Sequence, residues 1–354
     1  MKILITGGAG FVGGNLATKF ADEGNEVLCL DNLSRRGSEN NLTRFLNYPR
    51  IKFVHGDIRN SEDLDRVSFN PDVVLECSAQ TTAIDGYDHP IYDYTNNTHG
   101  VINVLEFCRK KNAGLIFWSS NKAYSGDLCN SIPVTETDTR LVWTPPDDFS
   151  LQGWSQKGFN EKMDLNGGNH TIYGVTKNAA DLICQEWSSA FDIPVIVNRF
   201  SCLYGPNQFG KVSQGWIVWF MLAKKFGIPL SYYGFGGKQV RDYLHIDDLF
   251  RLIYTQCLTI DNHTGSYYNV GGGVNNTTSV LELSNLLDES GFFADDVADV
   301  AHAKERKADQ QIYISDISKV SNDFMWKPEV KLDNALKKII IWINSDNNIK
   351  NWMK

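Results

Sequence analysis

The sequence of 354 residues lacks long hydrophobic runs. No stretch reaches the roughly 18 consecutive apolar residues that a helix needs to cross a bilayer. Residues 2–6 lead directly into a glycine-rich turn, and not into the apolar region of a secretory signal. We therefore expect neither a membrane span nor a secreted precursor.

Positive charge is also in short supply. The chain has 34 Lys and Arg against 42 Asp and Glu, which gives a net charge of −8. Proteins that bind nucleic acids or anionic membranes in general need a surplus of positive charge. The charge balance therefore predicts no nucleic-acid partner and no membrane partner, and any bound phosphate must be held by local groups.

The seven cysteines contain no CxxC pair, are widely spaced and are odd in number. This pattern is typical of reduced thiols, so we expect a cytoplasmic protein with neither disulfides nor a metal site.

The sequence does contain short apolar runs typical of strands, which alternate with segments of helical periodicity. Strands are expected at 2–6, 26–30, 51–54, 71–76, 113–118 and 194–198, and helices at 13–22, 100–110 and 173–190. This alternation predicts an α/β fold with a doubly wound parallel sheet. Beyond about residue 200 it breaks down, which predicts a smaller mixed α/β region, and residues 143–169 have no period and are expected to form a long functional loop.

A glycine turn joins the first strand to the first helix. Gly7, Gly10 and Gly13 form GxxGxxG, and Asp31 ends the second strand. Such a turn brings the backbone and a helix N-terminus close to a pyrophosphate, and the carboxylate accepts hydrogen bonds from a ribose. Asp31 would repel a 2′-phosphate, so the pattern predicts NAD and not NADP, a preference that Arg35 weakens. The alternative is a tight turn without a ligand.

Tyr173 and Lys177 are four residues apart, so they share one face of the predicted helix. A nearby ammonium favours the phenolate that a tyrosine needs to act as a base. Ser120, favoured over Ser119, follows the strand at 113–118 and would share the hydrogen bond to the reacting oxygen. An ordinary helical pair is the alternative, and the glycine turn makes the catalytic interpretation stronger.

These elements resemble the extended short-chain dehydrogenase/reductase superfamily over nearly the whole chain. Narrower segments at 31–37, 55–60, 120–122, 214–216 and 237–242 are similar to its CDP-paratose (CDP-tyvelose) 2-epimerases. The resemblance implies a Rossmann NAD-binding domain at 1–200, with contributions returning from about 239–270, and a mainly nucleotide-sugar-binding domain at 201–354. It also implies inversion of C2 of a CDP-linked 3,6-dideoxyhexose and a homodimer or homotetramer.

The resemblance further implies site residues. Besides the triad Ser120, Tyr173 and Lys177, the cofactor contacts it implies are Gly7, Gly10, Phe11, Val12, Gly13, Asp31, Asn32, Ser34, Arg35, Asp57, Ile58 and Asn97. The substrate contacts it implies are Asn121, Gln214, Gly215, Trp216, Gln239, Arg241, Arg306 and Asp309.

Three other functions use parts of the same pattern. A C4-epimerase acting on a UDP-hexose would use the same triad, but Cys202 lies where galactose-type epimerases have an asparagine. A 4,6-dehydratase needs an acid after the strand hydroxyl, where this chain has Asn121 and Lys122. A catalytically silent NAD-binding scaffold would most simply have lost Tyr173 or Lys177.

Overall fold

A computed structural model describes residues 1–293, 300–346, 349 and 352 of the chain. Its backbone forms two compact units. The first consists of Met1–Ser120, Ile172–Arg199 and Ile246–Tyr268, and the second of Asn121–Thr171, Phe200–His245 and Asn269–Lys354. These units do not show what each part binds. The NAD-binding domain at 1–200 and the nucleotide-sugar-binding domain at 201–354 therefore stay predictions.

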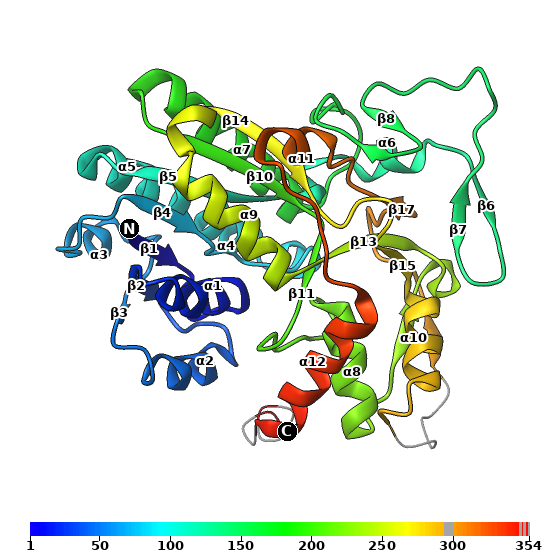
Figure 1. Cartoon of the computed structure of the whole chain (residues 1–354). Helices are drawn as coiled ribbons and strands as arrows, with labels where there is room; N and C mark the ends of the chain where they lie inside the picture. The colour runs from blue at the N-terminus through cyan, green and yellow to red at the C-terminus, as the bar shows by residue number, and fades with distance from the viewer. Residues whose placement is uncertain (294–299, 347–348, 350–351, 353–354) are drawn as a thin grey trace. The chain divides into compact units, whose positions relative to one another are not determined.

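A seven-stranded sheet, whose order is β14-β10-β5-β4-β1-β2-β3, forms the centre of the first unit (Figure 1). Its strands are β1 (Lys2–Thr6), β2 (Glu26–Asp31), β3 (Ile51–His55), β4 (Val73–Glu76), β5 (Gly114–Ser120), β10 (Val195–Phe200) and β14 (Ser266–Val270). The pairs among β1 to β5 are parallel. The chain goes outward from β1 in both directions, so the strand order reverses between β1 and β4, where ligands bind in such sheets. This architecture confirms the predicted doubly wound α/β fold.

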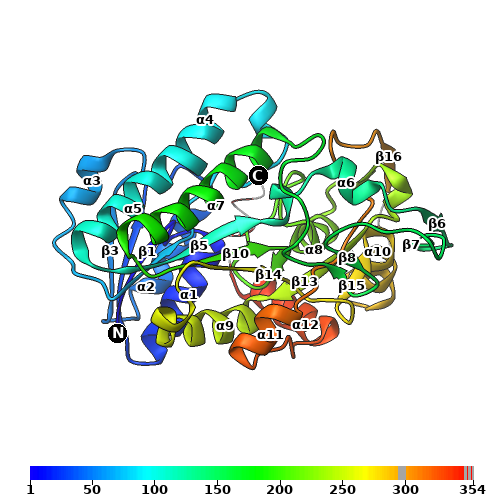
Figure 2. The same cartoon turned by 90° about the horizontal axis from the view of Figure 1, so that it is seen from above.

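Helices cover both faces of this sheet. They are α1 (Phe11–Asp22), α2 (Ser38–Phe45), α3 (Ser61–Asp65), α4 (Pro90–Tyr94), α5 (Gly100–Lys111), α7 (Ile172–Phe191) and α9 (Ile246–Leu258). Figure 2 shows α5 and α7 along one face and α1 and α9 along the other. Strands covered on both faces need continuous apolar runs, and all seven residues of β5 are buried. In the described ranges, no helix is both long and apolar enough to span a bilayer.

The second unit is mixed α/β. Its strands are β6 (Val134–Glu136), β7 (Leu141–Trp143), β8 (Trp154–Ser155), β9 (Gly158–Phe159), β11 (Cys202–Tyr204), β12 (Ser231–Tyr233), β13 (Val240–His245), β15 (Thr277–Ser279), β16 (Ala301–Ala303) and β17 (Ile312–Tyr313). Its helices are α6 (Gly126–Asn130), α8 (Trp216–Phe226), α10 (Val280–Glu289), α11 (Ser318–Phe324) and α12 (Leu332–Ser345). A four-stranded sheet joins β11, β13, β15 and β17.

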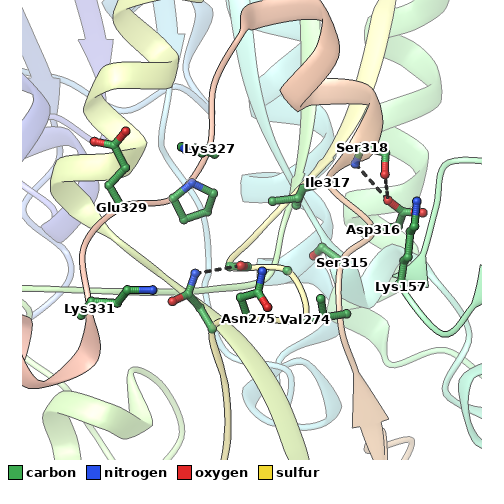
Figure 3. A pocket seen from close by; sticks show the side chains of 14 residues that line it. Lys157, Val274, Asn275, Ser315, Asp316, Ile317, Ser318, Lys327, Glu329 and Lys331 are labelled. Atoms are coloured by element: carbon green, nitrogen blue, oxygen red, sulfur yellow. Dashed lines mark hydrogen bonds between the residues drawn. The ribbon is translucent and has the colours of Figure 1, made fainter.

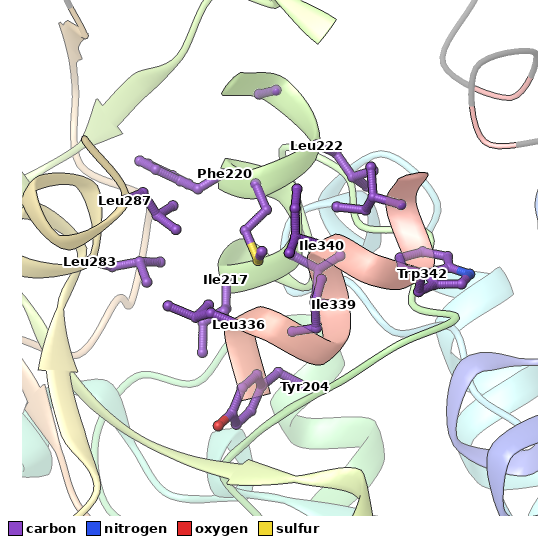
Figure 4. Close-up of a cluster of buried hydrophobic side chains, with 14 of the residues drawn as sticks. Tyr204, Ile217, Phe220, Leu222, Leu283, Leu287, Leu336, Ile339, Ile340 and Trp342 are labelled. Carbon is purple, nitrogen blue, oxygen red and sulfur yellow. The ribbon is translucent and has the colours of Figure 1, made fainter. Parts of the chain in front are cut away.

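The core of the second unit lies where α8 packs against α10 and α12 (Figure 4). Ile217 and Leu222 of α8, Leu287 of α10 and Ile339 of α12 are at most 1% exposed. Burial of one such side chain contributes about 1.5–3 kcal/mol, so this cluster gives the unit a core of its own.

The predicted loop at 143–169 contains local structure that its sequence did not predict. β8 and β9 pair within it, and Trp143 packs edge to face on Trp154 and Phe159, with ring centroids 5.5 and 5.7 Å apart. Aromatic packing needs no period, and for this reason the sequence pattern missed it.

A buried ion pair anchors α7 to the sheet. Asp181 of α7 and Arg199 of β10 are 0% and 2% exposed, and their side chains meet at 2.8 Å. Ser119 of β5 donates to the same Asp181 carboxylate at 2.7 Å. These contacts fix the position of α7 along β5 and β10.

We predict that Arg199→Met destabilises the protein by about 3–5 kcal/mol, because it leaves the Asp181 charge buried and unpaired. The measurement is the shift of the thermal and urea unfolding midpoints. Arg66→Met is the matched control, because the Arg66 side chain is 73% exposed and its contacts with Glu62 and Asp63 are 3.4–3.5 Å long. Equal shifts for the two variants would contradict the anchoring role.

Candidate functional site

The glycine turn lies between β1 and α1, at the switch point of the sheet. Gly7 has φ of +63°, and a Cβ there would lie 2.8 Å from the backbone of Cys77 and Ser78. A Cβ at Gly13 would lie 2.3 Å from the Gly7 carbonyl oxygen. Only glycine fits at these two positions, and the N-terminus of α1 is thereby left open to a pyrophosphate.

Asp31 lies at the end of β2, beside this turn. Its Oδ2 accepts a hydrogen bond from the Ala9 amide at 3.0 Å, and its Oδ1 accepts one from Leu33 at 2.8 Å. Burial raises the pKa of Asp31, while these amides, that of Gly10 and the charge of His55 lower it. Asp31 as a whole is 8% exposed, so its carboxylate lies in a buried setting beside the turn, where the carboxylate partner of a ribose is expected.

The other predicted cofactor contacts line the ends of the first three strands and the loop after β4. Asn32 donates to Asp57 at 2.9 Å, and Arg59 approaches the same carboxylate to 2.5 Å. Burial alone would raise the pKa of Asp57, but these hydrogen bonds lower it to about 2. Phe11 and Val12 begin α1, Ile58 is buried, Ser34 donates its amide to Asn32 at 3.0 Å, and Arg35 donates to Thr81 at 2.5 Å.

The predicted triad comes together on β5 and α7. Ser120 forms a side-chain hydrogen bond with Tyr173, and Lys177 lies one helical turn further along α7. Ser119 points away from this site, toward Asp181. The hydrogen bond to Tyr173 therefore supports Ser120 over Ser119 as the site residue.

Asn97 connects the loop after β4 to α7. Its Oδ1 accepts the Gln80 amide at 2.9 Å, and its Nδ2 donates to Thr176 at 3.2 Å. Thr176 is the neighbour of Lys177, so Asn97 positions the helix turn that carries the lysine.

Burial dominates the electrostatics of the triad. Burial and the charge of Asp93 together raise the pKa of Tyr173 to about 12, despite the hydrogen bond from Ser120. Burial also lowers the pKa of Lys177. In the described part of the chain, the buried Lys177 Nζ has no hydrogen-bond partner, and it lies 4.7 Å above the ring of Phe117.

Sequence reasoning missed two buried carboxylates beside the triad. Glu76 at the end of β4 and Asp93 in α4 are both 0% exposed, and their pKa values are raised by burial to about 7 and about 6. The signal for Glu76 was an acidic residue that ends a run predicted to be a buried strand. Asp93 had no comparable signal, because it lies in a helix of five residues that is too short to show a periodic pattern.

The predicted substrate residues lie in the second unit, where three of them, Asn121, Arg241 and Asp309, form one network with Lys122 and Gln310. Asp309 accepts hydrogen bonds from Lys122 at 3.0 Å and from Arg241 at 2.9 Å, and Asn121 donates to Gln310 at 3.3 Å. The two cations hold the pKa of Asp309 well below its usual range. The network places one guanidinium and one ammonium close together around one carboxylate.

The remaining predicted substrate residues lie around Tyr233 and the start of α8. The Gln239 side chain donates to the Tyr233 carbonyl at 3.3 Å, and the Arg306 guanidinium lies 4.3 Å from the Tyr233 ring centroid. Arg306 also donates to the Val212 carbonyl at 2.7 Å.

The segment that leads into α8 contains Gln214, Gly215 and Trp216. Gln214 exchanges backbone hydrogen bonds with Lys211 at 2.8 and 3.0 Å. Gly215 caps α8 with φ of +74°, and the Trp216 indole donates to Cys202 Sγ at 3.4 Å.

A cavity of about 620 Å³ lies elsewhere in the second unit (Figure 3). Lysines 157, 327 and 331 line it together with Asp316, Glu329 and the 272–276 turn. The predicted site residues, all within the described part of the chain, are not among its lining residues. Its wall is nevertheless tied to β13, because the amides of Gly273 and Ser315 both donate to Asp242 at 3.2 Å.

The residues of the first unit fit NAD. The glycine turn has no room for a Cβ, the carboxylate of Asp31 excludes a 2′-phosphate, and the Lys177 ammonium is buried without a protein hydrogen-bond partner in the described residues. NAD, with a pyrophosphate and the hydroxyl groups of two riboses, supplies the partners that these groups require.

The parallel sheet, the glycine turn and the pair Tyr173 and Lys177 together define an NAD-binding Rossmann protein of the short-chain dehydrogenase/reductase type. Residues 3–271 match the NAD dependent epimerase/dehydratase family, and the chain belongs to that family, whose cofactor is NAD. A CDP-paratose 2-epimerase from Salmonella typhi is 34% identical over 98% of this chain and 100% of the relative. A dTDP-glucose 4,6-dehydratase from Salmonella typhimurium is 27% identical over 99% and 96% of the two chains.

Solved structures agree with this family. A UDP-glucuronic acid 4-epimerase variant from Bacillus cereus, solved with NAD and a 4-deoxy-4-fluoro analogue of UDP-glucuronic acid, has a TM-score of 0.74 and 25% identity, covering 97% of this chain and 99% of that chain. A UDP-glucose 4-epimerase from Thermotoga maritima has a TM-score of 0.77 at 23% identity, covering 97% and 99%, and supports the fold.

We predict that Gly7→Ala lowers NAD affinity by at least about tenfold, because the new Cβ at 2.8 Å from the Cys77 and Ser78 backbone displaces the turn. The measurement is quenching of protein fluorescence by added NAD. Gly24→Ala is the matched control, because Gly24 also has positive φ, of +79°, but a Cβ there meets nothing within 4 Å. Equal loss of affinity in both variants would contradict the assigned role of the turn.

Proposed function

We propose that the chain inverts C2 of a CDP-linked 3,6-dideoxyhexose, interconverting CDP-tyvelose and CDP-paratose. The observation that carries the chemistry is the hydrogen bond between Ser120 and Tyr173 on the helix that also bears Lys177. The relative that is 34% identical over its full length, a CDP-paratose 2-epimerase, supports the choice of sugar and carbon.

In this proposal, Tyr173 removes the proton from the C2 hydroxyl and later returns a proton to the same oxygen. Ser120 holds that oxygen through a shared hydrogen bond, and Lys177 binds the nicotinamide ribose and favours the phenolate. When bound, NAD supplies the acceptor and donor of the C2 hydride, so the reaction is redox-neutral overall. The sugar presents its opposite face before the hydride returns, which inverts the carbon.

The second unit would hold the nucleotide. Arg241 and Arg306 bear permanent charges suited to a diphosphate, and Arg241 is oriented by Asp309 and by the Gln310 carbonyl at 2.6 Å. Gln214, Gly215, Trp216, Gln239 and Asn121 would contact the sugar or base.

Two observations favour C2 inversion over the related reactions. Cys202 accepts a hydrogen bond from Trp216 and offers no amide donor to a phosphate, unlike the asparagine expected of a galactose-type C4-epimerase. Asn121 and Lys122 follow Ser120, so the carboxylic acid that a 4,6-dehydratase needs there to eliminate water is replaced by an amide and by a lysine that pairs with Asp309.

The proposal extends to the protein's setting. All seven cysteines are free thiols, which supports a reducing cytoplasm. Assembly as a homodimer or homotetramer is proposed from the superfamily resemblance.

The test of the function is proton NMR of CDP-tyvelose incubated with the purified protein in D2O, without added cofactor. The expected result is CDP-paratose with no deuterium at C2. Absence of conversion by protein that retains NAD would reject this sugar, and the next substrates to test would be UDP-hexoses for C4 inversion.

We predict that Tyr173→Phe lowers the rate of epimerisation by about 10²–10⁴-fold, the range for loss of a general base, while NAD stays bound. Product formation is followed by NMR, and NAD retention by absorbance after gel filtration. Tyr94→Phe, at a tyrosine that is 50% exposed, is the control and keeps the wild-type rate. Unchanged turnover in Tyr173→Phe would eliminate Tyr173 as the base.

A further inference from the structure

Glu76 ends β4 in the middle of the sheet, in a row of residues that point to one face. In the register of the strands, it lies opposite Thr6 of β1 on one side and Phe117 of β5 on the other. Residues in register on parallel strands point to the same face. Phe117 packs in the core that contains Ala180 and Cys184 of α7, so Glu76 also faces α7.

Lys177 reaches the same place from α7. Its Nζ lies 4.7 Å from the centroid of the Phe117 ring, the ring that is beside Glu76 in the register. Lys177 is 2% exposed and Glu76 is 0% exposed, so both charges are shielded from water. Two opposite charges that share one aromatic neighbour in a buried layer interact strongly.

Each group also has an atom without a hydrogen-bond partner. Glu76 Oε1 accepts hydrogen bonds from the Ser78 amide at 3.0 Å and from the Thr6 hydroxyl at 3.3 Å. In the described part of the chain, Glu76 Oε2 and Lys177 Nζ are both buried without a partner. A buried charge left in this way is costly unless an opposite charge lies nearby.

Asp181 is the other carboxylate near Lys177, one turn further along α7. Its oxygens already accept hydrogen bonds from Arg199 at 2.8 and 3.0 Å and from Ser119 at 2.7 Å. Its charge is therefore neutralised by Arg199, and Glu76 remains as the counter-charge available to Lys177.

We infer that Glu76 is the counter-ion of Lys177 and a positioning residue of the proposed active site, acting on Tyr173 only through the charge of Lys177. The inference rests on the proposed function, because it explains how a buried lysine that favours the phenolate of Tyr173 stays charged. It adds Glu76 of β4 to the residues that determine the ionisation of the base.

The electrostatics agree with this geometry. Burial lowers the pKa of Lys177, and Glu76 is the strongest of the groups that raise it again. Burial raises the pKa of Glu76 to about 7, and Lys177 is the strongest of the groups that lower it. The other titratable groups that interact with this pair are Cys77 of the loop after β4, Cys108 of α5, and Asp181 and Cys184 of α7.

The consequence is a dependence on pH with a definite sign. Above about pH 7, Glu76 is ionised and holds the proton on Lys177. As the pH falls through this value, Glu76 takes up a proton and Lys177 loses its counter-charge. Because the folded pKa of Glu76 is above its usual value of 4.5, this carboxyl favours the folded state at low pH, and the contribution is lost as the pH rises toward 7.

The test is Glu76→Gln in the full-length protein labelled with ¹³Cε-lysine. Glutamine keeps an oxygen that can accept from Ser78 and Thr6, so the fold is expected to survive. The Lys177 NMR signal is assigned by its loss in Lys177→Met. We predict that the pKa of Lys177 falls by about one unit or more in Glu76→Gln, which is about a tenfold change in its proton affinity.

Glu62→Gln is the matched control, because the Glu62 side chain is 75% exposed and the substitution removes the same charge. It is expected to leave the Lys177 signal unchanged. An unchanged pKa of Lys177 in folded Glu76→Gln would overturn the inference. The titration needs no substrate, so its result tests the inference independently of which sugar the protein epimerises.

Two further measurements keep the test decisive. In the wild type, the Lys177 signal should show a step near pH 7 as Glu76 titrates, and its absence would overturn the inference even if Glu76→Gln does not fold. In the epimerisation assay, Glu76→Gln should lower kcat at alkaline pH with little change in KM, and Glu76→Asp should restore part of kcat. A purely structural role would lower kcat equally at every pH.

Discussion

The buried ion pair between Asp181 and Arg199 is the interaction on which the arrangement of the site depends. Asp181 is on α7, one turn beyond Lys177, and Arg199 is on β10, so their contact at 2.8 Å fixes the helix along the sheet. Ser119 adds a contact to the same carboxylate from β5. The next residue of β5, Ser120, forms a hydrogen bond with Tyr173 of the same helix. An ion pair that takes no part in the chemistry thus helps to hold α7, which bears Tyr173 and Lys177, against β5.

Burial is the second constraint, and it works against the proposed base. Lys177 is buried and Tyr173 is partly buried, and burial favours the neutral form of each. An active phenolate therefore needs charges placed around it. Glu76 supplies one negative charge that favours the charged form of Lys177, and the charged lysine in turn favours the phenolate.

Much of the fold could be predicted, because buried parallel strands carry continuous apolar runs that the sequence displays directly. Residues 2–6 were expected as a strand and form β1, and the helix expected at 173–190 is α7, from Ile172 to Phe191. The family was also predicted correctly, from the glycine turn and the Tyr–Lys spacing together. The roles of the individual site residues remain predictions.

Other features could not be predicted, because they depend on contacts distant in the sequence. Nothing local in the sequence pairs Asp181 with Arg199 or places Glu76 beside Lys177. The same holds for residues 143–169, where Trp143 and Phe159 pack without any period. Asp309 was expected among the substrate contacts, but its dense pairing with Lys122 and Arg241 is visible only in three dimensions.

The central claim is that the hydride removed from C2 returns to the same carbon through tightly held NAD. The most direct measurement uses CDP-tyvelose that carries deuterium at C2, incubated with the holoenzyme in ordinary water, with the product analysed by NMR and mass spectrometry. The account predicts CDP-paratose that keeps its deuterium at C2. Product that has lost this deuterium to the solvent would contradict hydride return and indicate inversion by proton exchange.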